Sequence, residues 1–120
     1  MPGYSTEEMG FAGMTELLRL DKRPTAVFAR NDSTAIGALN AIKQAELRIP
    51  EDIAVAGYDD IPLASHITPA LTTVRQPTRE QGRLSANFLL QRIEEDRERP
   101  RQEKIFDCEL IIRQSTTPIR

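Results

Sequence analysis

The sequence predicts an α/β protein with a parallel sheet, and it predicts that this sheet is incomplete. Two short apolar runs, residues 25–30 and 53–58, have the pattern of buried strands, and a helix of about residues 33–46 lies between them. Strand, helix and strand over this length form a βαβ unit with parallel strands and a right-handed crossover. A complete doubly wound domain usually has about five or six strands. We therefore expect that part of the domain is missing upstream.

Helical periodicity predicts a helix on each side of the first strand. In residues 5–20 apolar side chains recur at helical spacing, and Ser5 and Glu8 have the spacing of a capping box at the start. Asn31-Asp32-Ser33 can cap the helix of residues 33–46. That helix carries five apolar residues on one side: Ala35, Ala38, Leu39, Ile42 and Ala45.

Beyond residue 60 the predicted elements are more widely spaced. Residues 61–70 form an irregular loop, and residues 71–76 are extended as far as Pro77. A helix follows to about residue 95, with Thr78 and Gln81 at capping-box spacing. Its inward face is predicted to hold four residues: Gly82, Ala86, Leu89 and Ile93. The mixed-charge run that follows, residues 94–104, is interpreted as a solvated loop.

Residues 105–113 alternate between apolar and polar side chains, which predicts a strand with one solvated face near a sheet edge. The apolar face would hold Phe106, Cys108, Leu110 and Ile112. The solvated face would hold Asp107, Glu109 and Arg113. Cys108 is thus expected to be a buried structural thiol, and as the single cysteine it excludes an internal disulfide.

Charge and composition narrow the class of protein. A net charge of -2 and a pI near 5.5 argue against direct binding of nucleic acid by this segment. No signal peptide is visible, and no apolar run approaches the roughly 20 residues that span a bilayer. We therefore expect a cytoplasmic protein that does not bind a membrane.

Polar side chains follow both predicted central strands, at Asn31-Asp32 and at Asp59-Asp60. Ligands of open α/β sheets bind outside the carboxyl ends of the strands. Asn offers a donor and an acceptor, and a carboxylate accepts hydrogen bonds from sugar hydroxyls. A plain helix cap and a solvated turn are the alternative interpretations of the two pairs. We expect Asn31 and Asp59 to face a ligand. Asp32 and Asp60 would then be cap and turn residues.

Signals of catalysis are weak throughout the sequence. Neighbouring carboxylates on an extended strand end rarely face one substrate, as a catalytic pair must. His66 is the single histidine, and its neighbour Ser65 is poorly placed for a nucleophile–base pair. No metal-ligand spacing, Walker loop or G-x-S-x-G motif is present. We predict no catalytic residue, no metal and no cofactor.

Five segments in a specific order and spacing resemble a known family. They are Phe28–Asp32, Ala35–Ala38, Arg48–Asp60, Pro69–Pro77 and the set Glu80, Gly82 and Ala86. Together they resemble the effector-binding domain of LacI/GalR-family transcriptional regulators. The resemblance spans nearly the whole chain and implies a periplasmic-binding-protein-like fold of two α/β subdomains around a ligand cleft. It implies three parts: residues 1–77 are C-terminal subdomain, 78–104 are a crossover helix and charged loop of the N-terminal subdomain, and 105–120 are a returning strand and tail.

The resemblance also implies roles for individual residues. The positions that match family effector contacts are Asn31, Asp59 and Gln76, together with Ser5 or its neighbour Tyr4 at the start of the first helix. The positions that match the family dimer interface are Ile36, His66 and Ile67. One departure concerns Glu46, where the family usually has Gly at the helix end. Either Glu46 takes the left-handed conformation at a cost of about 1 kcal/mol, or the helix ends differently.

The implied function is that of a sensor module. A small effector, a sugar or similar polar metabolite, would close the cleft and change the affinity of a homodimer for operator DNA. Operator contact would come only through a missing helix-turn-helix head, so the chain alone would bind neither DNA nor effector tightly. The alternative is a sugar-binding protein of a transport system with the same fold. A third reading is an enzyme or phospho-accepting receiver that uses Asp59 or Asp60.

Overall fold

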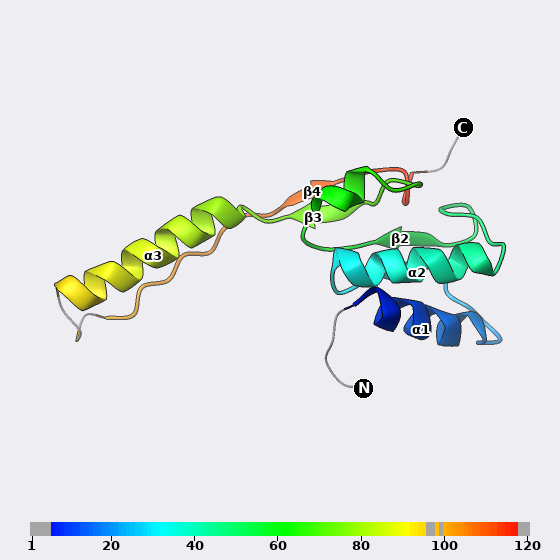
Figure 1. The fold of residues 1–120 in the computed structure, drawn as a ribbon, viewed down its shortest axis with the longest axis horizontal. Helices are drawn as coiled ribbons and strands as arrows, with labels where there is room; N and C mark the ends of the chain where they lie inside the picture. The colour runs from blue at the N-terminus through cyan, green and yellow to red at the C-terminus, as the bar shows by residue number, and fades with distance from the viewer. Residues whose placement is uncertain (1–5, 96–97, 99, 118–120) are drawn as a thin grey trace. The chain divides into compact units, whose positions relative to one another are not determined.

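Two parallel strands joined by a helix form the centre of the computed structural model, which describes residues 6–95, 98 and 100–117. The chain divides into two units: the described residues up to Arg75 with those from Leu110 onward, and residues 76–109. In chain order the elements are α1 (Glu7–Leu18), β1 (Ala26–Phe28), α2 (Asp32–Gln44), β2 (Ala54–Ala56), the 3-10 helix η1 (Pro62–Ser65), β3 (Thr73–Arg75), α3 (Thr78–Glu94) and β4 (Glu109–Ile111) (Figure 1).

The predicted βαβ unit is confirmed. β1 and β2 pair in parallel with Val27 opposite Val55, and α2 connects them. On the other side of β2, the Gly57 N–H donates to the carbonyl of Thr72 at 2.9 Å. The segment that enters β3 therefore lies along the end of β2, while β3 itself pairs with β4.

The core of the first unit lies between α2 and the strands. The predicted apolar side of α2 is buried, with the exception of Ala45, which is exposed. Leu39 and Ile42 pack there against a cluster that includes Val55 and Leu71. Burying a side chain of this size stabilises the fold by about 1.5–3 kcal/mol. This core fixes the strands, and hence the positions at which their ends emerge.

Helix α1 packs on α2 through two glycines. A Cβ atom on Gly37 would overlap the backbone carbonyl of Glu7, and one on Gly10 would overlap the carbonyl of Thr34. Figure 1 shows α2 lying between α1 and β2. Since the helix backbones themselves are in contact, no other residue fits at these two positions without moving the helices apart.

The two predicted capping boxes are wrong. The N-cap of α1 is Thr6, whose Oγ1 accepts from the Met9 N–H at 3.2 Å, while Ser5 lies outside the described residues. Helix α3 begins after Pro77, and Thr78 is its first helical residue with no side-chain cap. Ser and Thr have similar capping propensities. The spacing of a capping box therefore locates the start of a helix only to within about one residue.

Several faces predicted to be buried are exposed. Phe28 in β1 is 66% exposed, and Leu89 and Ile93 in α3 are both 59% exposed. The predicted apolar face near β4 is likewise open, with Leu110 60% exposed and Cys108 exposed. An apolar pattern identifies which face of an element can be buried, but only a packed neighbour buries it. Within the described part of the chain, Phe28, Leu89, Ile93 and Leu110 are left largely uncovered.

Glu46 adopts the left-handed conformation, with φ of 60°, so the prediction of strain at this position is confirmed. The Glu46 N–H donates to the carbonyl of Lys43 at 2.9 Å, and the Leu47 N–H donates to that of Ile42 at 3.2 Å. These two bonds are those of a Schellman motif, with Glu46 at the position that glycine prefers.

Replacing Glu46 by glycine is expected to raise the free energy of unfolding by about 1 kcal/mol, because glycine adopts this conformation without steric cost. Urea denaturation measures the change. Glu16→Gly inside α1 is the control and should lower stability by a similar amount. An equal loss in both variants would contradict the strain at Glu46.

Among the described residues, no helix combines the length and apolar character needed to cross a membrane.

Candidate functional site

The ends of β1 and β2 are joined by hydrogen bonds. The Asp32 N–H donates to the carbonyl of Tyr58 at 3.0 Å, and the Ile61 N–H donates to Asp32 Oδ2 at 2.9 Å. The loops after the two strands therefore form one polar edge of the sheet. This edge carries both residue pairs singled out from the sequence, Asn31-Asp32 and Asp59-Asp60.

Asn31 is the N-cap of α2. Its backbone is extended, with φ of -151°, and its Oδ1 accepts from the Thr34 N–H at 2.9 Å. The prediction that Asp32 or Ser33 would cap this helix is wrong, because the chain turns into the helix one residue earlier. Capping uses only the oxygen of the side chain, and the amide nitrogen of an asparagine carries two further donors. A cap and a ligand contact are thus compatible at Asn31.

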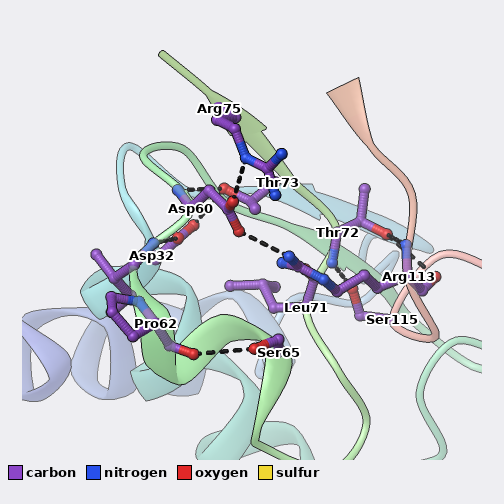
Figure 2. Close-up of polar contacts among 11 residues, drawn as sticks. Asp32, Asp60, Pro62, Ser65, Leu71, Thr72, Thr73, Arg75, Arg113 and Ser115 are labelled. Atoms are coloured by element: carbon purple, nitrogen blue, oxygen red, sulfur yellow. Dashed lines mark hydrogen bonds and ion pairs between the residues drawn. The ribbon is translucent and has the colours of Figure 1, made fainter. Parts of the chain in front are cut away.

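Asp32 is a buried anchor. Its side chain is 0% exposed, and Oδ1 accepts from the Thr73 hydroxyl at 2.6 Å while Oδ2 accepts from Ile61 (Figure 2). It occupies the first turn of α2, where the helix dipole favours a negative charge. Asp32 therefore links α2, the loop after β2, and β3.

Asp59 is exposed and has a φ of 120°, a conformation that favours glycine. Its N–H donates to the carbonyl of Val74 at 2.9 Å, which ties this strand end to β3. A non-glycine residue in such a conformation costs about 1–3 kcal/mol and persists only where the surrounding structure imposes it. Outliers of this kind cluster at functional sites.

Asp60 is more than the turn residue that was predicted. Its φ is 54°, and its carboxylate makes two ion pairs, from Oδ2 to Arg75 Nε at 2.7 Å and from Oδ1 to Arg113 Nη2 at 2.8 Å (Figure 2). Only 10% of its side chain is exposed. Burial raises the pKa of Asp60, but hydrogen bonds from Arg75 and then Arg113 outweigh it, so the pKa lies below its ordinary value.

Because its pKa is lowered in the folded state, Asp60 makes the stability of the fold depend on pH. The ionised Asp60 stabilises the fold at neutral pH, and its contribution is lost as the pH falls through the folded-state pKa.

Arg113 was predicted on the solvated face of its strand, and this is wrong. Its side chain is 16% exposed, and beyond the pair with Asp60 it donates from Nη1 to the carbonyl of Leu71 at 3.0 Å. Its N–H also donates to Thr72 Oγ1 at 2.8 Å. Sequence reasoning missed Thr73, Arg75 and Arg113 as members of the site. The sequence did show an arginine near the end of each of the last two predicted extended segments, Arg75 and Arg113. That both arginines contact Asp60 depends on the pairing of β3 with β4.

The other predicted site residues lie elsewhere. Gln76 is half-buried, begins the second unit, and accepts from the Thr78 N–H at 2.8 Å. Tyr4 and Ser5 lie outside the described residues. Of the predicted interface residues, Ile36 is 6% exposed within this chain, His66 is exposed, and Ile67 packs partly buried against the core. Little surface of Ile36 is thus available to a partner.

A parallel α/β sheet with polar groups gathered where its strands end is the arrangement in which open sheets hold small ligands. Across the part of the chain that the structure describes, no group of three or more His, Cys, Asp or Glu side chains could hold a metal ion. The sheet with its polar strand ends is typical of α/β domains that bind small ligands. Comparison with known proteins identifies the family.

The sequence model of the periplasmic binding protein-like domain family matches residues 2–116 of this chain. The ribose operon repressor of Escherichia coli (strain K12) is 54% identical over 84 residues, which is 70% of this chain and 26% of the repressor. A LacI family transcriptional regulator from Enterococcus faecium with bound ribose is 38% identical with a TM-score of 0.82, and the match covers 96% of this chain and 42% of that one. The lac repressor dimer bound to operator and the anti-inducer ONPF gives 34% identity and a TM-score of 0.82 over 92% of this chain and 33% of that one.

The chain therefore belongs to the periplasmic binding protein-like domain family, in the form found in LacI-family regulators. This confirms the resemblance inferred from the sequence. The chain spans about a quarter of the length of the ribose operon repressor, which agrees with an incomplete sheet. The relatives are named as repressors and regulators rather than as enzymes, in line with the expectation from the weak signals of catalysis.

Proposed function

We propose that this chain is the effector-sensing and dimerisation part of a LacI-family DNA-binding transcriptional regulator. The observation that carries the proposal is the difference in surroundings among the aspartates at the strand ends. The carboxylates of Asp32 and Asp60 are largely buried and bonded within the chain, and the neighbouring Asp59 is exposed and has a backbone conformation that is costly to maintain. Together with the amide of Asn31, this edge offers donors and acceptors suited to a sugar or a similar small polar metabolite.

D-Ribose is the first effector to test. The ribose operon repressor is a relative of this chain, and ribose is bound in the Enterococcus faecium structure. Both observations concern those proteins, and they support a sugar effector here without fixing which sugar it is.

In the proposed mechanism the chain forms one wall of a two-walled cleft. Residues 1–77 would belong to the C-terminal subdomain, with Gln76 near the cleft, while residues 78–104 would belong to the N-terminal subdomain and residues 105–120 would run back. Effector binding would favour one of two states of a homodimer, because a ligand shifts an equilibrium only by its differential affinity. His66, Ile67 and Ile36 would lie at the dimer contact. A helix-turn-helix head outside this chain would contact operator DNA in the cytoplasm.

The alternative of a transport-system sugar-binding protein shares the fold, but the named relatives support a regulator instead.

A chimera tests the proposal directly. This chain replaces the matching segment of the Escherichia coli ribose operon repressor, and fluorescence anisotropy measures binding to that repressor's operator with and without D-ribose. We expect operator affinity to change at least about tenfold with ribose, a coupling of about 1.4 kcal/mol. A chimera that binds operator and responds to no sugar in a panel of pentoses, hexoses and uronates would refute a sugar-sensing role.

Substituting Asp59 by asparagine is expected to weaken D-ribose binding by the chimera about 10- to 100-fold, because hydrogen bonds to a charged acceptor contribute about 1.5–3 kcal/mol. Calorimetric titration gives the dissociation constant. The melting temperature should change little, since Asp59 is exposed. Asp107→Asn removes another exposed carboxylate and serves as the control. Equal affinities in the two variants would exclude Asp59 as an effector contact.

A further inference from the structure

The turn after β2 holds two consecutive residues with positive φ, Asp59 at 120° and Asp60 at 54°. Neither is glycine, so the turn is strained at both positions. The backbone N–H of Asp59 donates to Val74, and that of Asp60 donates to Thr73 Oγ1 at 3.2 Å. These backbone bonds set the turn beside β3, but neither one involves a carboxylate.

The Asp60 carboxylate supplies a further restraint. It accepts from Arg75, the last residue of β3, and from Arg113, which follows β4. The chain leaves the first unit after Arg75 and returns to it at Leu110. A single carboxylate thus ties the strained turn to both strands through which the two units are connected (Figure 2).

We propose that Asp60 is a positioning residue of the effector site. Through Arg75 and Arg113 it holds the turn in its left-handed conformation, so that the neighbouring Asp59 carboxylate is presented at the sheet edge. This role rests on the proposed function, and it makes effector affinity depend on both connecting strands. Asp60 itself would not touch the effector, because only 10% of its side chain is exposed and both of its oxygens face arginines.

A purely structural role for these ion pairs predicts a different outcome. Removing one partner of a largely buried ion pair lowers stability, because the other charge is left without its partner. If they only stabilised the fold, removing them would lower the melting temperature and leave the geometry of Asp59 and the affinity for a sugar unchanged. If they position Asp59, the backbone of Asp59 and the affinity change together.

The first arm of the test uses the 120-residue chain alone. NMR backbone couplings report φ at Asp59, and carboxyl shifts report the pKa of Asp60. We expect Asp60→Asn to move Asp59 out of its positive φ, and Arg113→Lys, which keeps a charge, to retain it. Asp52→Asn removes a carboxylate that is paired with Arg48 outside this turn, and it should leave Asp59 unchanged. An unaltered φ at Asp59 in a folded Asp60→Asn chain would overturn the proposal. Should that variant fail to fold, Arg113→Gln takes its place with the same two outcomes.

The second arm measures D-ribose affinity of the chimera by calorimetry. We expect Asp60→Asn to weaken binding about tenfold or more, Arg113→Lys to retain most of the affinity, and the double variant Asp60→Asn/Arg113→Gln to be no weaker than Asp60→Asn alone. Affinity within twofold of the parent for Asp60→Asn would overturn the positioning role. A parent chimera that does not bind D-ribose would count against the proposed effector only, because the first arm judges the geometry without any ligand.

Discussion

Replacing Gly37 by alanine is expected to lower the free energy of unfolding by about 3 kcal/mol or more. The new Cβ atom would overlap the backbone carbonyl of Glu7, so α1 would have to move away from α2. A flexible side chain could yield at small cost, but a helix backbone yields only if the whole interface opens. Because small domains are stable by only about 5–15 kcal/mol, this loss is a large share of the total.

Urea denaturation followed by circular dichroism measures this effect. Gly13→Ala is the matched control, since Gly13 lies in α1 and a Cβ there would meet nothing within 4 Å. Alanine is a better helix former than glycine, so Gly13→Ala should gain about 0.5–1 kcal/mol. Opposite signs for the two substitutions are the expected result. Two gains would mean that α1 does not pack on α2 through Gly37.

Replacing Asp32 by alanine is expected to cost about 3 kcal/mol. The substitution removes the acceptor of the Ile61 N–H and of the Thr73 hydroxyl, and the site is 0% exposed. Donors left unsatisfied in such a site each cost about 1–3 kcal/mol. The loss of a negative charge in the first turn of α2 adds to the effect.

Three variants separate these causes in thermal melts. Asp32→Asn keeps one acceptor oxygen and should lose clearly less stability than Asp32→Ala. Asp21→Ala removes an exposed aspartate and should change stability by less than about 0.5 kcal/mol. If Asp32→Ala had the same melting temperature as Asp21→Ala, the buried hydrogen bonds of Asp32 would not hold the strand ends together.

Local patterns predicted the centre of the fold because its contacts are close in sequence. The parallel pairing of β1 and β2 and the buried side of α2 both depend on a segment of about 30 residues. The left-handed Glu46 was instead predicted from the family resemblance. Helix starts were displaced by a residue, since Thr6 and Ser5 cap almost equally well. The exposed side chains of Phe28 and Leu110 show that an apolar face does not reveal whether a neighbour covers it.

The polar strand ends were predicted from the sequence, but the contacts of their side chains were not. Both strand ends were identified from the sequence, because ligands of parallel sheets bind where strands end. The helix cap at the first strand end was assigned wrongly, because Asn31 caps α2 and Asp32 is a buried anchor. The ion pairs of Asp60 join residues more than a dozen positions apart, and they follow from the pairing of β3 with β4, which no local pattern encodes.

Calorimetric titration of D-ribose into the isolated 120-residue chain and into the chimera tests most directly the claim that this chain is one wall of a two-walled effector cleft. One wall alone makes too few contacts for tight binding, so we expect no binding by the isolated chain at micromolar ribose and clear binding by the chimera. Micromolar affinity of the isolated chain, or an affinity of the isolated chain equal to that of the chimera, would contradict it.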